Sequence, residues 1–423
     1  MVQTLLIIVV TAVVTLTLSI IKRNLVTPER KLDYHLNELA LSDPTFERCM
    51  AHLLGPPLVD GNRITTLSNG DEIFPAMLAA IRSAQLTITF ETFIYWSGKV
   101  GREFAAALAD RAKSGVRVHV LLDWLGSSKL DAAALADLKE AGVEVEHYRP
   151  LRWYSLSRMN NRTHRKILVV DGRVGFIGGV GIADQWSGHA QSPDHWRDSH
   201  FKLEGPAVAH LQAAFADNWM KTRADVFNAD AYFPVLDTRG TSRAQVFKSS
   251  PREGADSARL MFLLSIAAAR KSILIANAYF VPDARTITAL VEALERGVQV
   301  EIIVPGRHID TKITRRASRA QWGHLLAAGA AIYEYQPTMY HCKVMVIDGL
   351  WVSVGSANFD NRSFRLNDEA NLNVLDRVLA GEQIDAFDND KRACRKVSLQ
   401  QWQSRPWREK AVERVASLLR SQV

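Results

Sequence analysis

Two residues that can perform acid–base chemistry, His341 and Lys343, stand two positions apart in the apolar run HCKVMVID. On a β-strand such side chains project from the same face, so the imidazole and the ammonium share one small volume. That combination suits a dianionic phosphate: the lysine holds its charge, and the histidine attacks it or transfers a proton. After Asp348, a second apolar run ends in GSAN, where Ser356 and Asn358 can donate to oxygens.

The same pattern occurs earlier in the chain. In the run HRKILVVD, His164, Lys166 and Asp171 keep the spacing of the later copy, and the chain then reaches GGVG, which contains Gly179 and Gly181. Two hairpins with incidental His and Lys are the structural alternative. Equal internal spacing in both copies favours a paired chemical site instead.

The doubled signature His-x-Lys-x4-Asp-x6-Gly-Gly/Ser-x-Asn resembles that of the phospholipase D superfamily. Three further runs, ETFIY at 91–95, ANAYFVP at 276–282 and LNDEAN at 366–371, are similar to bacterial cardiolipin synthases. The resemblance covers residues 61–376. It implies an α/β fold of two phospholipase D-like α/β/α sandwich halves packed face to face, which share one cleft. It also implies catalysis through a phosphohistidine, with no cofactor and no metal.

The resemblance further assigns roles to single residues. His164 is the expected nucleophile, and His341 is the expected acid that later acts as a base on the incoming alcohol. The lysines of both motifs are expected to stabilise charge on the phosphate oxygens. Ser356, Asn358 and Gly179 are expected to line the same substrate site.

Four carboxylates accompany the motifs. The resemblance gives Asp198 in WRDS and Glu369 in NDEAN the task of orienting a histidine, and from sequence alone each could equally be a surface ion pair. Asp171 and Asp348, at the strand-ending turns, belong to the motifs, and we expect a structural role for both. Gly181 stands where the family has Asn, and we expect another donor to fill that space.

Composition and charge restrict the class of protein. With 423 residues, of which 47% are hydrophobic, the chain can bury a large core, and two domains are expected. The net charge of +7 suits an anionic partner, either nucleic acid or an acidic lipid surface. The three cysteines cannot all pair, and one lies inside a motif strand, so we expect reduced thiols in the cytosol.

The N-terminus predicts a membrane anchor. Residues 2–21 form an almost unbroken apolar run that is long enough to span a bilayer. Lys22 and Arg23 follow at once, so the positive-inside rule places the downstream chain in the cytoplasm, with one crossing of the cell membrane. The alternatives are a cleaved leader and a buried core helix. We expect residues 22–60, with mixed charge and several prolines, to be a linker.

Periodicity predicts a duplicated α/β unit, because apolar runs of strand period alternate with helical runs in the same order twice. We also expect a hairpin that pairs 62–67 with 72–74 across an Asn69-Gly70 turn. The expected helices are 77–83, 101–112, 132–140, 266–270, 286–296 and 321–328, and the expected strands are 86–92, 116–122, 143–147, 272–276, 298–304 and 330–335. The expected domains are 61–219 and 244–390, with a connection at 220–243 and a basic tail at 391–423.

Two segments outside the repeats suit a lipid surface. Residues 151–163 carry Arg, Trp and Tyr side chains beside the first motif, as headgroup-binding loops do, although an ordinary solvated loop remains an alternative. The run 408–420 predicts a helix with an apolar face of Ala411, Val415, Leu418 and Leu419. It either packs on the body or lies on anionic lipid, and packing is slightly favoured.

The resemblance therefore implies a cardiolipin synthase-like phosphatidyltransferase. It would move a phosphatidyl group between phosphatidylglycerol molecules and would meet phosphatidylglycerol, cardiolipin and the membrane surface. A phospholipase that uses water is the alternative in the same class. An endonuclease fits the basic charge, but the apolar N-terminus and the lipid-family runs disfavour nucleic acid as a partner. Two intact motifs disfavour a non-catalytic scaffold, and nothing in the sequence indicates an oligomeric state.

Overall fold

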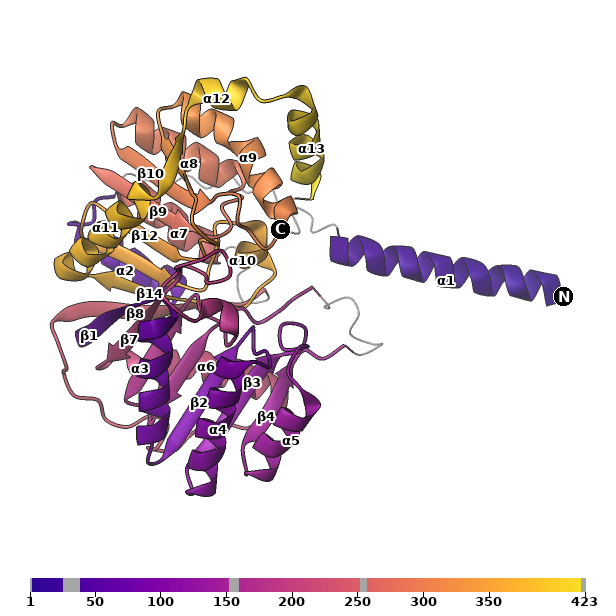
Figure 1. The fold of residues 1–423 in the computed structure, drawn as a ribbon, viewed down its shortest axis with the longest axis vertical. Coiled ribbons are helices and arrows are strands. Elements are labelled where there is room, and N and C mark those ends of the chain that lie inside the picture. The colour runs from indigo at the N-terminus through magenta and orange to yellow at the C-terminus, as the bar shows by residue number, and fades with distance from the viewer. Residues whose placement is uncertain (1, 26–38, 152–159, 252–256, 420–423) are drawn as a thin grey trace.

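The computed structural model describes residues 2–25, 39–151, 160–251 and 257–419, and in them the strands form one 15-stranded sheet (Figure 1). The strands are β1 Val59–Ser68, β2 Thr87–Thr92, β3 Arg117–Asp123, β4 Glu144–Tyr148, β5 Ile167–Val170, β6 Val174–Gly178, β7 Ser199–Glu204, β8 Ser242–Ser249, β9 Ser272–Asn277, β10 Gln299–Pro305, β11 Ala331–Tyr335, β12 Lys343–Ile347, β13 Trp351–Gly355, β14 Glu369–Leu375 and β15 Cys394–Val397. Their order is β15-β11-β10-β9-β12-β13-β14-β8-β1-β7-β6-β5-β2-β3-β4.

The sheet consists of two halves with the same strand order. The first half reads β1-β7-β6-β5-β2-β3-β4 and the second reads β8-β14-β13-β12-β9-β10-β11. In each half the last three strands are parallel, and the motif strand, β5 or β12, pairs with them in the antiparallel sense. The halves meet where β1 pairs with β8. The duplicated α/β fold predicted from the sequence is confirmed.

Helices cover both faces of each half. On the outer faces lie α3 Asn69–Ser83, α4 Lys99–Lys113 and α5 Ala132–Glu140 in the first half and α7 Ser257–Ala268, α8 Ala284–Glu295 and α9 Lys312–Ala327 in the second. On the inner faces lie α6 Val208–Arg223 and α11 Arg377–Arg392, which share one apolar core with strands of both halves. This shared core, which contains Phe201, Val352 and Leu372, holds the two sandwiches together.

The predicted hairpin at 62–74 is wrong, because α3 begins directly after β1. Asn69 does adopt a turn conformation, with φ of 59°. Acidic residues in the first turn of the helix then favour its positive end, and the Glu72 carboxylate accepts the Ser68 N–H at 2.9 Å. Gly70 packs so closely that a Cβ would lie 2.0 Å from the Trp186 carbonyl oxygen. The Asn-Gly pair therefore marks a tight approach to another loop.

The helix expected at 77–83 is the longer α3, and two predicted helices of the second half are also too short. The helix expected at 266–270 is α7 Ser257–Ala268, and the one expected at 321–328 is α9 Lys312–Ala327. Helix α7 is apolar on nearly all sides and buried, so it has no polar face to reveal a helical period. The first half of α9 is basic, and its Arg315 forms an ion pair with the buried Glu334 at 2.5 Å. That pairing depends on tertiary contacts, which sequence periodicity does not report.

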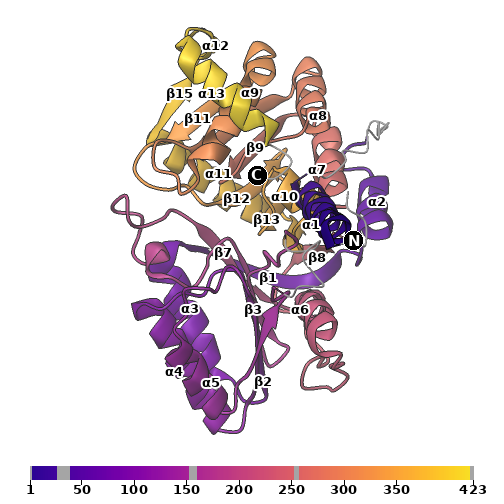
Figure 2. The same ribbon diagram turned by 90° about the vertical axis from the view of Figure 1, so that its right-hand side faces the viewer.

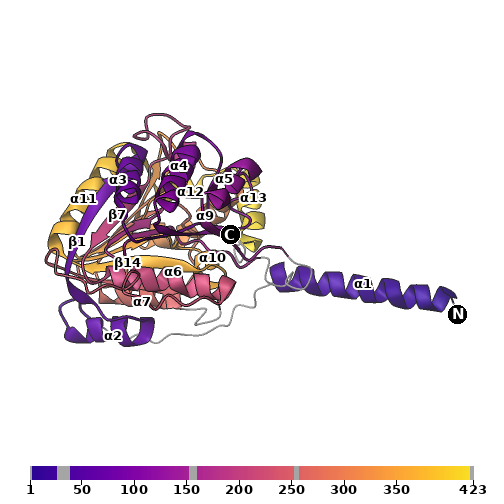
Figure 3. The ribbon, with the colours of Figure 1, turned by 90° about the horizontal axis from the view of Figure 1, so that it is seen from below.

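The N-terminal region contains two different helices. Helix α1 Val2–Leu25 projects away from the body (Figure 1), and its stretch Val2–Ser19 has a mean hydropathy of 2.2 with none of it buried. It is a candidate membrane span. Helix α2 Pro44–Leu54 instead packs beside α7 (Figure 3), and its Phe46 ring meets Trp351 edge-on at 4.9 Å. From α2 onward, residues inside the expected linker 22–60 thus belong to the core of the second half.

The C-terminal segment adds β15, which pairs antiparallel with β11, and the helices α12 Leu399–Gln403 and α13 Trp407–Leu418 (Figure 2). Helix α13 packs on α9. Its packed face carries Glu413 and Ala416, whereas Val415 and Leu418 are 64% and 77% exposed. The helix packs on the body, as favoured, but the predicted apolar face is not the face that packs.

Candidate active site

Each motif histidine is fixed by the half of the molecule that does not contain it. The backbone N–H of His164 donates to the carbonyl oxygen of Asp368 at 2.9 Å, and that of His341 donates to Arg197 at 2.7 Å. Thr163 and Tyr340, the residues just before the histidines, form isolated bridges to the same two partners. The halves are therefore held in register at the point where the chemistry would occur.

The orienting carboxylates are also exchanged between the halves. His164 Nδ1 lies 3.0 Å from both carboxylate oxygens of Glu369, and His341 Nδ1 lies 2.7 Å from Oδ2 of Asp198. Both carboxylates are completely buried. A carboxylate on Nδ1 fixes the imidazole tautomer and leaves Nε2 as the reactive atom. Neither motif histidine is therefore paired with the orienting carboxylate of its own half.

The two lysines lie in the same buried volume. Lys166 Nζ donates to the His164 carbonyl oxygen at 2.7 Å, and Lys343 Nζ donates to that of His341 at 2.6 Å. Burial, together with repulsion from the Lys343 ammonium, lowers the pKa of Lys166 to about 7, although the Glu369 carboxylate acts in the opposite direction. A phosphate diester between them would favour the charged form of both.

Burial and ion pairing act in opposite directions on the histidine–carboxylate pairs. Burial lowers the pKa of His164 to about 4, and it also lowers the pKa of His341. Burial alone would raise the pKa values of Glu369 and Asp198, but the facing histidines and lysines hold both below their usual values. Each imidazole is thus balanced between burial, which favours its neutral form, and the facing carboxylate, which favours its protonated form.

Glu369 is held by hydroxyl groups of its own half. Ser363 Oγ donates to its Oε1 at 2.8 Å, and Ser356 Oγ donates to its Oε2. Asn358 donates its backbone N–H to Ser363 at 2.9 Å, while its buried side-chain oxygen has no hydrogen-bond partner in the described residues. The expected substrate ligand Ser356 therefore contacts the carboxylate, and Asn358 retains an acceptor without a partner.

Asp198 is held by different groups. Trp186 donates its indole N–H to Oδ2 at 2.9 Å, and the backbone N–H of Ser199 donates to Oδ1 at 2.8 Å. Asn69 fixes the backbone of Asp198 from both sides, since its N–H donates to the Asp198 carbonyl and its Oδ1 accepts the Asp198 N–H. The turn before α3 thus supports the second histidine pair.

Comparisons with known proteins match both halves of the chain to one family. Residues 77–219 and 263–391 match the family described as "Cardiolipin synthase, PLD-like domain". The chain belongs to this family. The match covers both halves, each with its His-x-Lys motif, so the protein is a phosphatidyltransferase of the phospholipase D superfamily.

Individual relatives agree with the family assignment. The cardiolipin synthase of Geobacillus kaustophilus (strain HTA426) is 35% identical over 374 residues, which are 88% of this chain and 74% of the relative. Cardiolipin synthase 1 of Bacillus cereus is 35% identical over 400 residues, which are 90% of this chain and 78% of that protein. The crystal structure of phosphatidylserine synthase from Haemophilus influenzae Rd KW20 shares the fold, with a TM-score of 0.66 and 15% identity, over 90% of this chain and 99% of that one.

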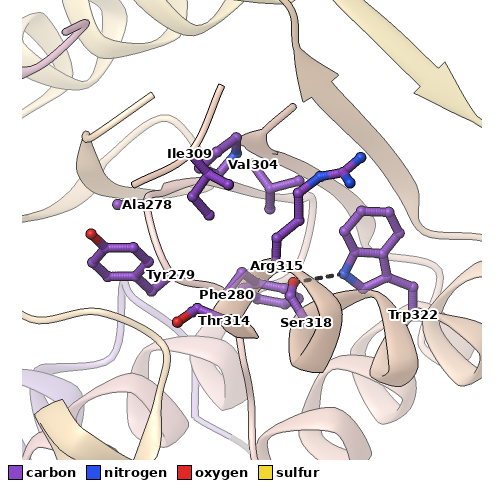
Figure 4. Close-up of a pocket in the computed structure, with 10 residues that line it drawn as sticks. Ala278, Tyr279, Phe280, Val304, Ile309, Thr314, Arg315, Ser318 and Trp322 are labelled. Atoms are coloured by element: carbon purple, nitrogen blue, oxygen red, sulfur yellow. Dashed lines mark hydrogen bonds between the residues drawn. The ribbon is translucent and has the colours of Figure 1, made fainter. Parts of the chain in front are cut away.

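Aromatic rings contact both histidines of this cardiolipin synthase family member, one at His164 and three at His341 among the described residues. Phe93 meets the His164 ring at 5.5 Å, and Trp186, Trp196 and Tyr279 lie between 5.3 and 6.1 Å from the His341 ring. Tyr279 also lines a small pocket with Phe280, Arg315 and Trp322 (Figure 4). Both histidines are buried, with exposed fractions of 9% for His164 and 4% for His341.

Two glycines of the first motif are required by close packing. A Cβ at Gly179 would lie 2.3 Å from a carboxylate oxygen of Asp198. A Cβ at Gly181 would lie 2.7 Å from Cβ of Ile94 and 3.1 Å from the Trp186 ring. The Trp186 indole thus lies where the family's Asn side chain would begin, but it donates to Asp198 and not toward a substrate.

Asp171 and Asp348 lie at turns, in the left-handed conformation with φ of 53° and 52°. The Asp171 carboxylate accepts the backbone N–H groups of residues 85–87, and that of Asp348 accepts those of residues 270–272. Both tie the motif hairpin to the start of the neighbouring strand. Their carboxylates support the fold and do not point at the histidines.

The runs that carried the family resemblance support the site from behind. Glu91 is fully buried and accepts hydrogen bonds from Thr163 and Asn218, and burial raises its pKa to about 7. In the second half, Asn277 Oδ1 accepts the backbone N–H groups of Tyr279 and Phe359 at 3.2 Å each. These residues fix the loops next to the histidines.

Sequence reasoning missed Trp186 and the exchange of carboxylates. Trp186 lies eight residues after Gly178, and Ser363 lies eight residues after Gly355. Alignment of the two repeats could therefore have identified Trp186 as the counterpart of Ser363, which donates to the other carboxylate. The exchange has no sequence signal, because each carboxylate follows the motif of its own half. Most of the predicted headgroup loop 151–163 lies outside the described residues, at 152–159.

Proposed function

We propose that this protein is a cardiolipin synthase that transfers a phosphatidyl group from one phosphatidylglycerol to the hydroxyl of another through a phosphohistidine. The main support is the pair of buried imidazoles, each bound through Nδ1 to a carboxylate of the other half and each accompanied by the lysine of its own motif. Such a set can supply a nucleophile, an acid and charge stabilisation for one phosphate diester.

In the first step, Nε2 of His164 attacks the phosphorus of the donor. The bond between phosphorus and the glycerol oxygen breaks as the P–N bond forms. His341, protonated in this state, gives its proton to the departing glycerol and becomes neutral. Lys166 and Lys343 stabilise the charge on the non-bridging oxygens. Phosphatidyl-His164 and free glycerol are the products.

In the second step, His341 removes the proton from the hydroxyl of a second phosphatidylglycerol. The resulting oxygen attacks phosphorus, the P–N bond breaks, and His164 recovers its lone pair. Cardiolipin leaves, and His341 carries the proton that the next cycle needs. The aromatic rings of Trp186, Trp196 and Tyr279 contact His341 and make its surroundings apolar. Such surroundings favour a lipid alcohol over water as the acceptor in this step.

Purified protein incubated with phosphatidylglycerol labelled in its acyl chains tests the proposal. The account predicts cardiolipin and glycerol in equal amounts, with no product from the His164→Asn variant. An Asp237→Asn variant, changed in an exposed side chain far from the site in sequence, serves as the matched control. Phosphatidic acid as the main product would instead make the protein a phospholipase that uses water.

We further propose that α1 crosses the cell membrane once and that the catalytic body lies in the cytoplasm. Basic residues directly follow the apolar stretch, at Lys22 and Arg23, and they favour the cytoplasmic side. A cysteine introduced at the exposed Val378 should react with a membrane-impermeant thiol reagent only after cells are opened. Reaction in intact spheroplasts would place the body outside.

A further inference from the structure

Helix α13 presents an apolar surface to solvent. Trp407, Val415 and Leu418 are 73%, 64% and 77% exposed, and Ala411 is exposed between them. Positions 407, 411, 415 and 418 recur every three or four residues, so they share one side of the helix. An apolar side that faces away from the protein body is unusual for a helix that packs on a core.

The opposite side of α13 explains this orientation. Glu413 is only 4% exposed and forms ion pairs with Arg319 at 2.9 Å and Arg405 at 3.0 Å. Ala416 packs against Val281 and Ala317 in a small apolar cluster. Since an unpaired buried Glu413 would be costly, rotation of the helix to bury its apolar side is disfavoured. The ion pairs of Glu413 therefore keep the apolar side of α13 directed toward solvent.

The charge around this surface matches an anionic partner. Arg408, Lys410 and Arg414 are all exposed and lie beside the apolar side of α13. Helix α1, the candidate membrane span, extends from the same side of the body on which α13 lies (Figures 1 and 2). An amphipathic helix with Trp at one end and cations along its flank has the composition of a helix that lies in a bilayer interface.

A second exposed apolar segment lies in the loop after β3, where Trp124 and Leu125 are 36% and 53% exposed. The next residue, Gly126, packs on Phe93, whose ring contacts His164. Helix α13 is connected to the second histidine in a similar way. Its Ala416 packs against Val281, and Val281 lies two residues after Tyr279, whose ring contacts His341. Each motif histidine is thus linked to an exposed apolar segment through the residues packed between them.

We propose that the exposed side of α13 and the Trp124–Leu125 loop form a docking surface for an anionic lipid bilayer. The cations of α13 attract the headgroups, and Trp407, Val415 and Leu418 enter the interface. Both apolar segments then hold the site against the bilayer from which its substrate must come. This last consequence rests on the proposed lipid substrate, whereas the docking itself does not.

A fluorophore sensitive to its surroundings, attached to full-length Val415→Cys protein in phosphatidylglycerol vesicles, tests the docking without any activity. The proposal predicts strong quenching by lipids that carry a nitroxide on the acyl chain. Val378→Cys is the control, because Val378 is 74% exposed on α11, on the opposite side of the body from α1 (Figure 1). Unsubstituted protein reports labelling of Cys49 and Cys394, which are half-buried.

Equal quenching at both positions would overturn the proposal. Shielding of the Val415 probe that persists in detergent and increases with protein concentration would also overturn it. In that case a second copy of the chain, and not a bilayer, would cover the exposed side of α13.

A double variant, Val415→Glu with Leu418→Glu, separates docking from chemistry. It should lose most of its activity on bilayers and keep the activity of the unchanged protein on detergent-dispersed lipid. Unchanged activity on bilayers would contradict the proposal. If neither the double variant nor the unchanged protein formed cardiolipin, but the Val415 probe was still quenched, the proposed reaction would be wrong and the docking surface would still be supported.

Discussion

Single residues make the two histidine pairs unequal. Glu369 is held by two serine hydroxyls, whereas Asp198 is held by the Trp186 indole and a backbone N–H. The indole also stacks edge-on to His341, with ring centroids 5.4 Å apart, so one side chain sets both members of that pair. This difference provides a physical basis for different tasks of the two imidazoles.

Replacement of Trp186 by Phe should lower kcat about tenfold or more and change KM little. The variant keeps most of the ring but removes a hydrogen bond to a buried carboxylate, which contributes about 1.5–3 kcal/mol. The pKa of Asp198 should rise, so the acidic limb of the pH–rate profile should move to higher pH. Trp196→Phe is the matched control, since Trp196 contacts the His341 ring and has no described bond to Asp198. Equal effects of both changes would show that only ring packing matters.

Lys166 should set the alkaline limb of kcat/KM. Burial lowers its pKa to about 7, so the free enzyme loses this charge as the pH rises above 7, and kcat/KM should then fall by about tenfold per pH unit. Arginine keeps its charge in this range, and Lys166→Arg should flatten that limb even if its maximum is lower. An identical alkaline limb in both proteins would assign it to another group.

At the scale of elements, each motif strand is positioned by its terminal turn. Asp171 and Asp348 adopt the left-handed conformation and accept backbone N–H groups from the start of β2 and β9. These contacts set the register of β5 on β2 and of β12 on β9, and thereby the position of His164 and His341, which lie just before the two strands and not on them.

Asp171→Asn should lower the thermal midpoint but leave kcat per folded molecule unchanged. Asparagine tolerates the left-handed conformation, but its side chain has one acceptor oxygen where the carboxylate has two. About 1–3 kcal/mol of stability should therefore be lost. Asp237→Asn, an exposed change in the connection, should have no such effect. A large loss of kcat at unchanged midpoint would mean that Asp171 takes part in the chemistry.

The sequence predicted those elements that its own periodicity defines. Strands β2 and β9, helices α5 and α8 and the repeat itself follow from apolar spacing. Periodicity failed at α3, where an Asn-Gly turn leads into a helix, and at α13, where the buried Glu413 decides which side packs. It could not show the exchange of Glu369 and Asp198, because contacts between halves leave no mark on local spacing.

At the scale of the whole molecule, the two halves form one site because they complete each other. Backbone bonds and carboxylates cross between the halves at both histidines, and a shared core behind β5 and β12 holds this arrangement. The N-terminal helix is separate from this core, since no part of Val2–Ser19 is buried. The candidate membrane span thus lies outside the part of the chain that brings the two histidine pairs together.

Removal of residues 1–21 should therefore leave a folded enzyme that is active on detergent-dispersed lipid. A larger share of the shortened protein should remain in the supernatant when membranes are sedimented, and the unchanged chain provides the comparison. Aggregation of the shortened chain with loss of its thermal transition would show that α1 contributes to the core.

The most direct test of the account is to identify the residue that carries the covalent intermediate. In His341→Asn, a phosphodiester with a nitrophenyl leaving group needs no acid, so His164 should still attack it, while release to an acceptor is slowed. Acid-labile label should accumulate on the peptide that contains His164, and His164→Asn should take up none. Label that forms only when His341 is intact and maps to His341 would contradict it.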